Sequence, residues 1–241
     1  MDFPTYPNSD VLLARLVRGQ DTGLSMDDLP SAAEGKPPSE EFLCRLAEQL
    51  GLHSHDLRLI AGLAIPDDEL LFDEEAGREL PRLVQRALPL PASGRRQLRD
   101  CVRSLPEIRQ SLSPRKQRPY EQYPPSFGSL LVRMLALRNL GWSSAAKVMY
   151  LMSDVCLSAA TIGAVGRGVR EIDAELLTGF AAVLGVPVAV LASLTGVQVA
   201  TASRRPSAVI VDTAALLWEV RQLTAGQLRR LCELAEELGR E

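Results

Sequence analysis

The chain has few of the residues on which catalytic and metal sites depend. Its only histidines, His53 and His55, have no cysteine or carboxylate partner at a ligand spacing. Its four cysteines form no C-x-x-C pair, which predicts reduced, buried thiols instead of a zinc or redox site. No nucleophile and base stand in a known catalytic pattern. We therefore expect the chain not to be an enzyme and to need no cofactor or metal.

Aromatic residues are also scarce. They make up 5% of the chain, whereas hydrophobic residues as a whole make up 46%. This composition favours helices rich in Leu and Ala over strands, which are enriched in aromatic and β-branched residues. The first ten residues contain neither a basic region nor an apolar run, so we expect no secretory signal and a cytoplasmic location. The expected fold class is all-α.

The chain carries an internal repeat. Residues 24–105 align with residues 157–238 at a nearly constant offset of 133 or 134, and the matched positions are mostly glycine and apolar. The clearest match pairs SEEFLCRLAEQLG at 39–51 with DAELLTGFAAVLG at 173–185. The period is too long for a solenoid unit. The repeat therefore predicts two related helical domains in tandem, each ending in a pair of helices.

One uncharged run, residues 176–197, is long enough to cross a bilayer. Its counterpart in the first copy, residues 42–63, carries Arg45, Glu48 and Asp56. We therefore expect both runs to form a helix, a glycine turn and a short helix, with no membrane contact. The uncharged second copy should be buried against the first copy or a second subunit.

A segment rich in proline and cations, residues 106–126, predicts a basic, non-helical linker between domains at 1–105 and 127–241. Apolar periodicity and capping residues predict helices that start at residues 11, 25 and 39 or cover 54–62, 80–87, 94–104, 127–142, 143–152, 209–223 and 224–238. The helix at 143–152 would be capped by Ser143 or Ser144. The acidic stretch before residue 80 is expected to be a solvated connector, and Arg138 is expected to lie off the apolar stripe of its helix.

The second copy resembles a known DNA-binding module. Residues 157–196 read LSAATIGAVGRGVREIDAELLTGFAAVLGVPVAVLASLTG, in which Ser158 begins a helix and an Arg-Gly-Val-Arg turn ends it. A Gly-Trp-Ser sequence at 141–143 precedes the previous helix. Over residues 127–197 this pattern resembles the Cro-like, xenobiotic-response-element family of helix-turn-helix domains. The resemblance implies that the helix from Ser158 enters the major groove of double-stranded DNA.

The resemblance implies DNA contacts at the starts of two successive helices and at the turn after the second. The residues expected there are Ser143, Ser144, Lys147, Ser158, Ala159, Thr161, Arg167 and Arg170. The cations would contact phosphates, whereas Thr161 can reach a base edge. The segment departs from the family pattern because the spacing from Ser143 to Ser158 is about four residues longer than usual. This changes the angle at which the recognition helix from Ser158 would enter the groove. The recognition helix is also rich in Ala and Gly, which make no bidentate base contacts.

The first copy departs further from the pattern. Its equivalent helix, at about residues 25–35, carries Asp27, Asp28 and Glu34, which would repel phosphates. Residues 1–105 have a net charge of −6 and residues 106–241 a net charge of +3. We therefore expect the second copy alone to contact DNA and the first to serve assembly.

Two functions remain open from the sequence. One is a DNA-binding transcriptional regulator that forms a homodimer to span two half-sites. The other is a non-enzymatic protein-interaction scaffold whose helix-turn-helix folds no longer contact DNA. The Ala- and Gly-rich recognition helix and the isoelectric point near 5.6 favour the scaffold. A continuous positive face over Lys147, Ser158, Arg167 and Arg170 would favour DNA, and a broken or apolar face would favour a protein partner.

Overall fold

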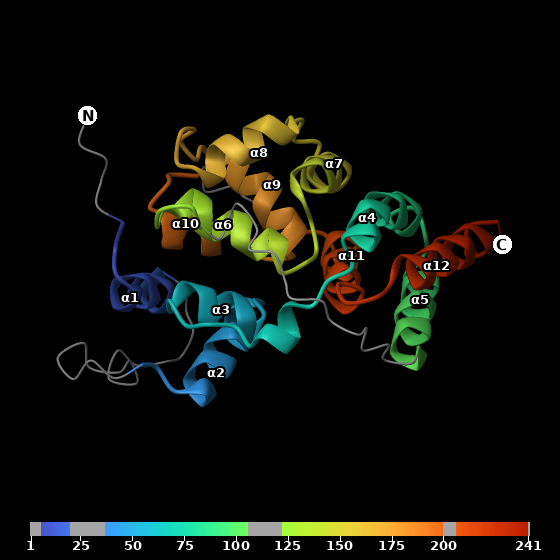
Figure 1. Cartoon of the computed structure of the whole chain (residues 1–241), viewed down its shortest axis with the longest axis horizontal. Coiled ribbons are helices and arrows are strands. Elements are labelled where there is room, and N and C mark those ends of the chain that lie inside the picture. Colours follow the sequence, from blue (N-terminus) through green and yellow to red (C-terminus); the bar gives the residue numbers. More distant parts are fainter. Residues whose placement is uncertain (1–5, 20–36, 106–121, 200–205, 241) are drawn as a thin grey trace.

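A computed structural model describes residues 6–19, 37–105, 122–199 and 206–240, and these residues form helices and connections without a strand (Figure 1). The α-helices are α1 (Ser9–Gly19), α2 (Glu40–Leu50), α3 (Ser54–Ile60), α4 (Glu74–Ala87), α5 (Ala92–Ser104), α6 (Phe127–Ala136), α7 (Trp142–Ser153), α8 (Ala159–Gly166), α9 (Ala174–Leu184), α10 (Val188–Thr195), α11 (Ala208–Glu219) and α12 (Ala225–Leu238), with a short 3-10 helix, η3, at Asp67–Leu70. The all-α prediction is confirmed for the described residues.

Several helix starts lie where the capping residues predicted them. The Ser39 hydroxyl accepts a hydrogen bond from the backbone N–H of Phe42 at 3.2 Å, which caps α2. Thr224 and Gln227 form a reciprocal capping box at the start of α12. The helices α2 and α9 end at Gly51 and Gly185, whose φ angles of 70° and 75° lie in the left-handed region that favours glycine.

The helix α4 begins earlier than predicted. The sequence indicated a helix from residue 80 after a solvated acidic connector, but α4 begins at Glu74 because the Asp73 carboxylate accepts from the N–H groups of Glu75 and Ala76. Pro81 then lies inside the helix and is buried. It has no N–H to donate to the carbonyl of Gly77, four residues earlier. The hydroxyl of Ser144, from α7, donates to that carbonyl at 2.8 Å and so replaces the missing bond.

The helix α6 is shorter than predicted, and this changes the place of Arg138. Instead of continuing to residue 142, α6 ends at Ala136, and the chain turns at Asn139, which has a φ of 57°. The turn directs Arg138 into the interior, where its side chain is 0% exposed. The prediction that Arg138 lies off the buried stripe was therefore wrong. The next helix, α7, has Gly141 at its N-cap, so neither Ser143 nor Ser144 caps it.

The repeat is visible in the helix boundaries. The helices α2, α3 and α4 begin 134 residues before α9, α10 and α11, and α5 begins 133 residues before α12. The helices α1 and α7 also begin 133 residues apart, although their sequences lie outside the aligned ranges. The helix expected from residue 25, which would match α8, lies outside the described residues, and among the described residues of the first half no helix corresponds to α6.

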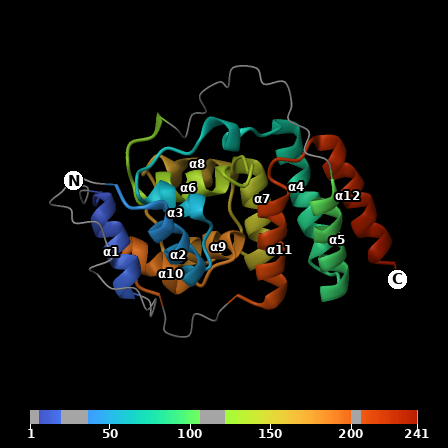
Figure 2. The same ribbon diagram turned by 90° about the horizontal axis from the view of Figure 1, so that it is seen from below.

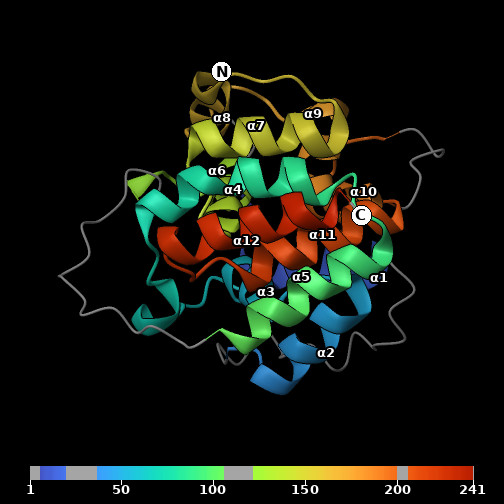
Figure 3. The same cartoon turned by 90° about the vertical axis from the view of Figure 1, so that its right-hand side faces the viewer.

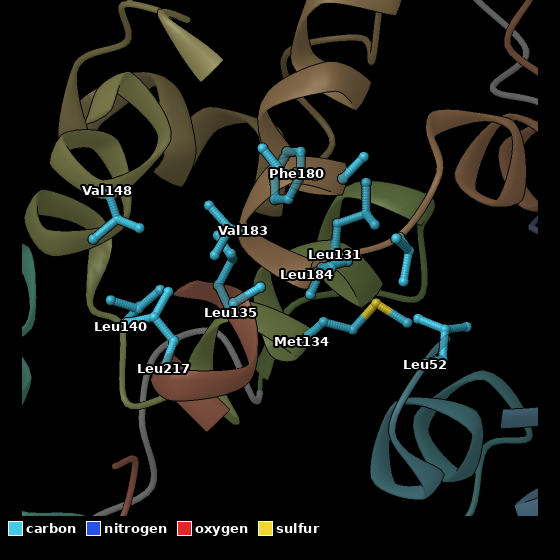
Figure 4. Close-up of a cluster of buried hydrophobic side chains, with 14 of the residues drawn as sticks. Leu52, Leu131, Met134, Leu135, Leu140, Val148, Phe180, Val183, Leu184 and Leu217 are labelled. Atoms are coloured by element: carbon cyan, nitrogen blue, oxygen red, sulfur yellow. The ribbon is translucent and has the colours of Figure 1, made fainter. Parts of the chain in front are cut away.

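Helices of both halves pack into one hydrophobic core. In it, α1 packs against α10, α3 against α6, and α4 against α7 and α12. Figure 4 shows part of this core, with Leu52 of the first half and Leu217 of α11 on opposite sides of Met134. The uncharged run at 176–197 is largely buried, and α1 covers part of it, as the sequence predicted.

The cysteines are less buried than predicted. Cys44 and Cys156 are exposed, Cys101 is half-buried and only Cys232 is buried. Cys44 and Cys156 lie on the outer sides of their segments, away from the apolar positions that build the core. The prediction of four buried thiols was therefore wrong for at least these two residues.

Candidate nucleic-acid interface

The segment expected to bind DNA forms two packed helices joined by a turn. The helix α7 ends at Ser153, the left-handed Asp154 (φ 58°) turns the chain, and α8 begins after its N-cap Ser158. The helix α8 packs against both α6 and α7, and α9 packs against α7 (Figure 1).

The start of α8 presents hydroxyl groups. The Ser158 hydroxyl accepts from the backbone N–H of Thr161 at 3.1 Å and lies 3.0 Å from the Thr161 hydroxyl. Ser158 is exposed, whereas Ala159 and Thr161 are half-buried. Neither α7 nor α8 has an acidic residue in its first turn, where the partial positive charge of a helix is concentrated. The two helix starts are therefore electrostatically compatible with phosphate.

The two expected contact residues of α7 have different environments. Ser143 is exposed. Ser144 is only 8% exposed, and its hydroxyl is bonded to the Gly77 carbonyl. Its role is to satisfy α4, so Ser144 is withdrawn from the candidate DNA contacts. The sequence alone could not predict this role of Ser144, because the role depends on Pro81 in the other half of the chain.

The three expected cations are all exposed. Lys147 lies on the outer side of α7, and the Arg167 guanidinium lies 5.9 Å from the centre of the Trp142 ring. Arg170 forms an ion pair of 3.3 Å with Asp173. Because both side chains of this pair are about half exposed, it contributes little to stability and can open for another anion.

Carboxylates interrupt the positive charge of this surface. Asp154, Glu171, Asp173 and Glu175 are exposed along the same stretch as the three cations. Three of them lie in the connection from α8 to α9 and the first turn of α9, beyond the C-terminal end of α8. The face is therefore mixed in charge, and the first turns of α7 and α8 contribute no acidic residue to it.

The two glycines of α8 face other parts of the same chain. A β-carbon on Gly163 would lie 3.0 Å from the Trp142 ring, and one on Gly166 would lie 2.9 Å from the Tyr123 ring. Both glycines are buried. Aromatic packing thus explains the two glycines within the helix, and close approach to DNA is not needed to explain them.

A cleft of about 460 Å³ lies where α4 meets α7 and α8. It is lined by Glu74, Gly77, Arg78, Val132, Asn139, Leu140, Gly141, Trp142, Ser143, Ser144 and Ala159. Arg78 is exposed and makes no ion pair within the described part of the chain. The first half therefore places one cation and one carboxylate, Glu74, beside the candidate DNA contacts. Sequence reasoning missed Arg78 because nothing in its neighbourhood along the chain indicates that α4 packs on α7.

A second cluster of charged and aromatic groups joins the two halves of the chain. Arg138 binds the Asp56 carboxylate through two hydrogen bonds of 3.0 and 2.9 Å, and both side chains are fully buried. His53 stacks on Trp218 with 3.8 Å between ring centres, and Arg221 lies 3.9 Å from the same ring. Burial and the charge of Arg138 lower the pKa of His53 to about 4. His53 is therefore a half-buried, neutral ring, whereas His55 contacts the Glu69 carboxylate as well as the edge of Trp218. Sequence reasoning had no signal for their shared partner Trp218.

No group of three or more His, Cys, Asp or Glu side chains is placed to hold a metal ion within residues 6–19, 37–105, 122–199 and 206–240. In the same ranges no helix is long and apolar enough to cross a membrane. The chain matches no family model, no curated protein and no solved structure.

Proposed function

We propose that this protein is a DNA-binding transcriptional regulator whose second half contacts DNA and whose first half supports it. The observation that carries the proposal is the pair of exposed helix starts of α7 and α8, whose own first turns contain no acidic residue and which place Ser143 and Ser158 at the surface. Backbone N–H groups at such starts favour phosphate. Lys147, Arg167 and Arg170 lie exposed in the same two helices and the turn that follows them.

The helix α8 would make few base contacts in this arrangement. Thr161 is its one half-exposed residue with a hydroxyl beyond the cap, and its neighbours Ala160 and Ala164 can only pack against a base. Affinity would therefore come mainly from phosphates, and sequence preference would be modest. The first half would act through α4, which packs along α7 and is tied to it by the Ser144 hydrogen bond.

The proposal is tested by fluorescence-anisotropy titration of the whole protein with fragments of duplex DNA at several salt concentrations. Replacing Arg167 and Arg170 with Ala should weaken binding to all fragments and reduce the salt slope by up to about 0.9 log unit per lost phosphate contact. Replacing Thr161 with Val should instead change the preference among fragments. A suitable control is Arg96→Ala, which removes one exposed cation from α5. Binding that is absent at low salt would contradict the proposal.

The alternative is a protein-interaction scaffold, and two observations favour it. Four exposed carboxylates break the positive face, and two apolar side chains near that face, Tyr150 and Val169, are 53% and 77% exposed. Exposed apolar groups beside mixed charge are typical of a protein-binding surface. The titration separates the two functions, because a scaffold would show no salt-sensitive affinity for DNA.

A further inference from the structure

The last two helices of each half pack reciprocally. The helix α4 of the first half packs against α12 of the second, and α11 of the second packs against α5 of the first (Figures 2 and 3). Since α4 corresponds to α11 and α5 to α12, exchanging the halves maps one contact onto the other. Two further contacts, α4 with α11 and α5 with α12, map onto themselves. The four helices therefore form a pseudo-symmetric unit.

The polar contacts of this unit repeat with the same offset as the sequence. Arg86 of α4 forms an ion pair of 2.7 Å with Glu236 of α12. The buried residues of α4 and α11 align at an offset of 133, as Leu83 with Leu216 and Val84 with Leu217. This offset pairs Arg86 with Glu219 and Glu236 with Arg103. Glu219 of α11 and Arg103 of α5 indeed form an ion pair of 3.1 Å, with the two charges reversed.

A second pair of contacts follows the same rule. Arg86 donates a hydrogen bond of 2.8 Å to the carbonyl of Cys232, and the equivalent positions are Glu219 and Arg99. Arg99 donates to both carboxylate oxygens of Glu219, at 2.6 and 3.0 Å. Equivalent positions thus meet in both contacts, although the acceptor is a backbone carbonyl in one and a carboxylate in the other.

Contacts in which residue i meets residue j while j meets i are the mark of a two-fold interface between identical subunits. Here both halves of such an interface belong to one chain. The surface with which a single-copy ancestor would bind its twin is therefore already covered. The large apolar side chains that remain exposed in the described residues, Val11, Tyr150, Val169 and Val211, lie on four different segments of the chain.

We infer that the chain is an internal dimer, and that it works as a monomer that contacts one asymmetric DNA site. This replaces the homodimer expected from the sequence. The DNA part of the inference rests on the proposed function, because it takes α8 as the single reading helix. The assembly part rests only on the reciprocal packing of α4, α5, α11 and α12.

The assembly part is tested first by light scattering of the whole protein. The expected mass is that of one chain, 26.3 kDa, over the full micromolar range. A protease site is then placed within residues 106–121 of the whole chain and cut after folding. The two pieces should stay together at micromolar concentration. A stable dimer of intact chains, or separation of the pieces, would overturn the inference.

Charge variants locate the contact. In the cut protein, Glu219→Arg should weaken the association of the pieces roughly tenfold or more, because it opposes Arg99 and Arg103. Glu233→Arg is the matched control, since it makes the same charge change at an exposed position of α12. Adding Arg99→Glu and Arg103→Glu to Glu219→Arg should restore association. An association equal to the control in the single variant, or no recovery in the triple variant, would refute the assigned contact.

The DNA part is tested with a bound duplex and with an inverted repeat of the same sequence. One chain should bind the single site, and the inverted repeat should take two chains without cooperativity. Cooperative binding to the inverted repeat would refute the single-site reading. If no duplex is bound at all, the proposed function and the single-site reading both fail, whereas the mass and cleavage results decide the internal dimer by themselves.

Discussion

Replacing Asp56 with Asn should destabilise the protein strongly, because it leaves the buried Arg138 charge without its counter-ion. The two side chains are 0% exposed and joined by hydrogen bonds of 2.9 and 3.0 Å. In the variant, Arg138 would face the amide oxygen of the introduced Asn, the Met134 carbonyl at 2.9 Å and the Trp218 ring, whose centre is 5.2 Å away, but no negative charge. The amide of Asn is nearly isosteric with the carboxyl group, so the effect reports the charge and not a cavity.

The expected loss follows from the burial. Removing one partner of a fully buried ion pair costs about 3–5 kcal/mol in the free energy of unfolding. For a chain of this size, each kcal/mol lowers the melting temperature by about 2–4 °C, so the melting temperature should fall by about 10 °C. Urea unfolding followed by circular dichroism measures the free energy, and a thermal melt measures the shift.

Two variants test the reasoning. Glu40→Gln breaks the more exposed ion pair between Arg58 and Glu40, and it should cost less than about 1 kcal/mol. The double change Asp56→Leu with Arg138→Met removes both charges and should recover most of the stability, because no uncompensated charge remains. If Asp56→Asn costs no more than Glu40→Gln, the Arg138 charge is not buried as described and the reasoning fails.

Three further predictions concern the stability of the fold. The folded protein holds His53 in its neutral form, so His53 stabilises the fold at a pH above 6.5, its pKa in the unfolded chain, and this stabilisation is lost as the pH falls towards about 4, its pKa in the folded protein. Urea unfolding should therefore show a free energy of unfolding that falls by about 2 kcal/mol from pH 7 to pH 5. This pH dependence should disappear in His53→Phe. Ser144→Ala should cost about 1–3 kcal/mol because the Gly77 carbonyl loses the hydroxyl that replaces its missing partner, and an effect below Ser143→Ala in the same assay would contradict this. Gly128→Ala should destabilise by about 1–3 kcal/mol in thermal melts because its β-carbon would lie 1.9 Å from the Val165 carbonyl oxygen. The matched change Gly226→Ala, at an exposed position of α12, should be neutral or stabilising, and equal effects would refute the close approach of α6 to α8.

The amino-acid sequence by itself determined the features that depend on a single helical turn. Capping residues such as Ser39, Ser158 and Thr224 specify helix starts because their side chains bond backbone N–H groups two or three residues later. Glycines such as Gly51 and Gly185 specify helix ends through their positive φ. The burial of residues 176–197 also followed from the sequence, because exposing a long apolar run without charges to water is unfavourable.

The tertiary structure alone decided which side chains of the candidate site are free and which are already bound. Ser144 and Ser143 are neighbours in the sequence, but only Ser144 meets a carbonyl that Pro81 leaves unpaired. The sequence pattern predicts Arg138 on the exposed side of a helix, but in the structure the turn at Asn139 places it against Asp56. The reciprocal packing of α4, α5, α11 and α12 is likewise absent from any local pattern. Each of these contacts joins residues far apart in the chain, and its energy depends on both partners. The residues around one partner in the sequence therefore cannot predict the contact.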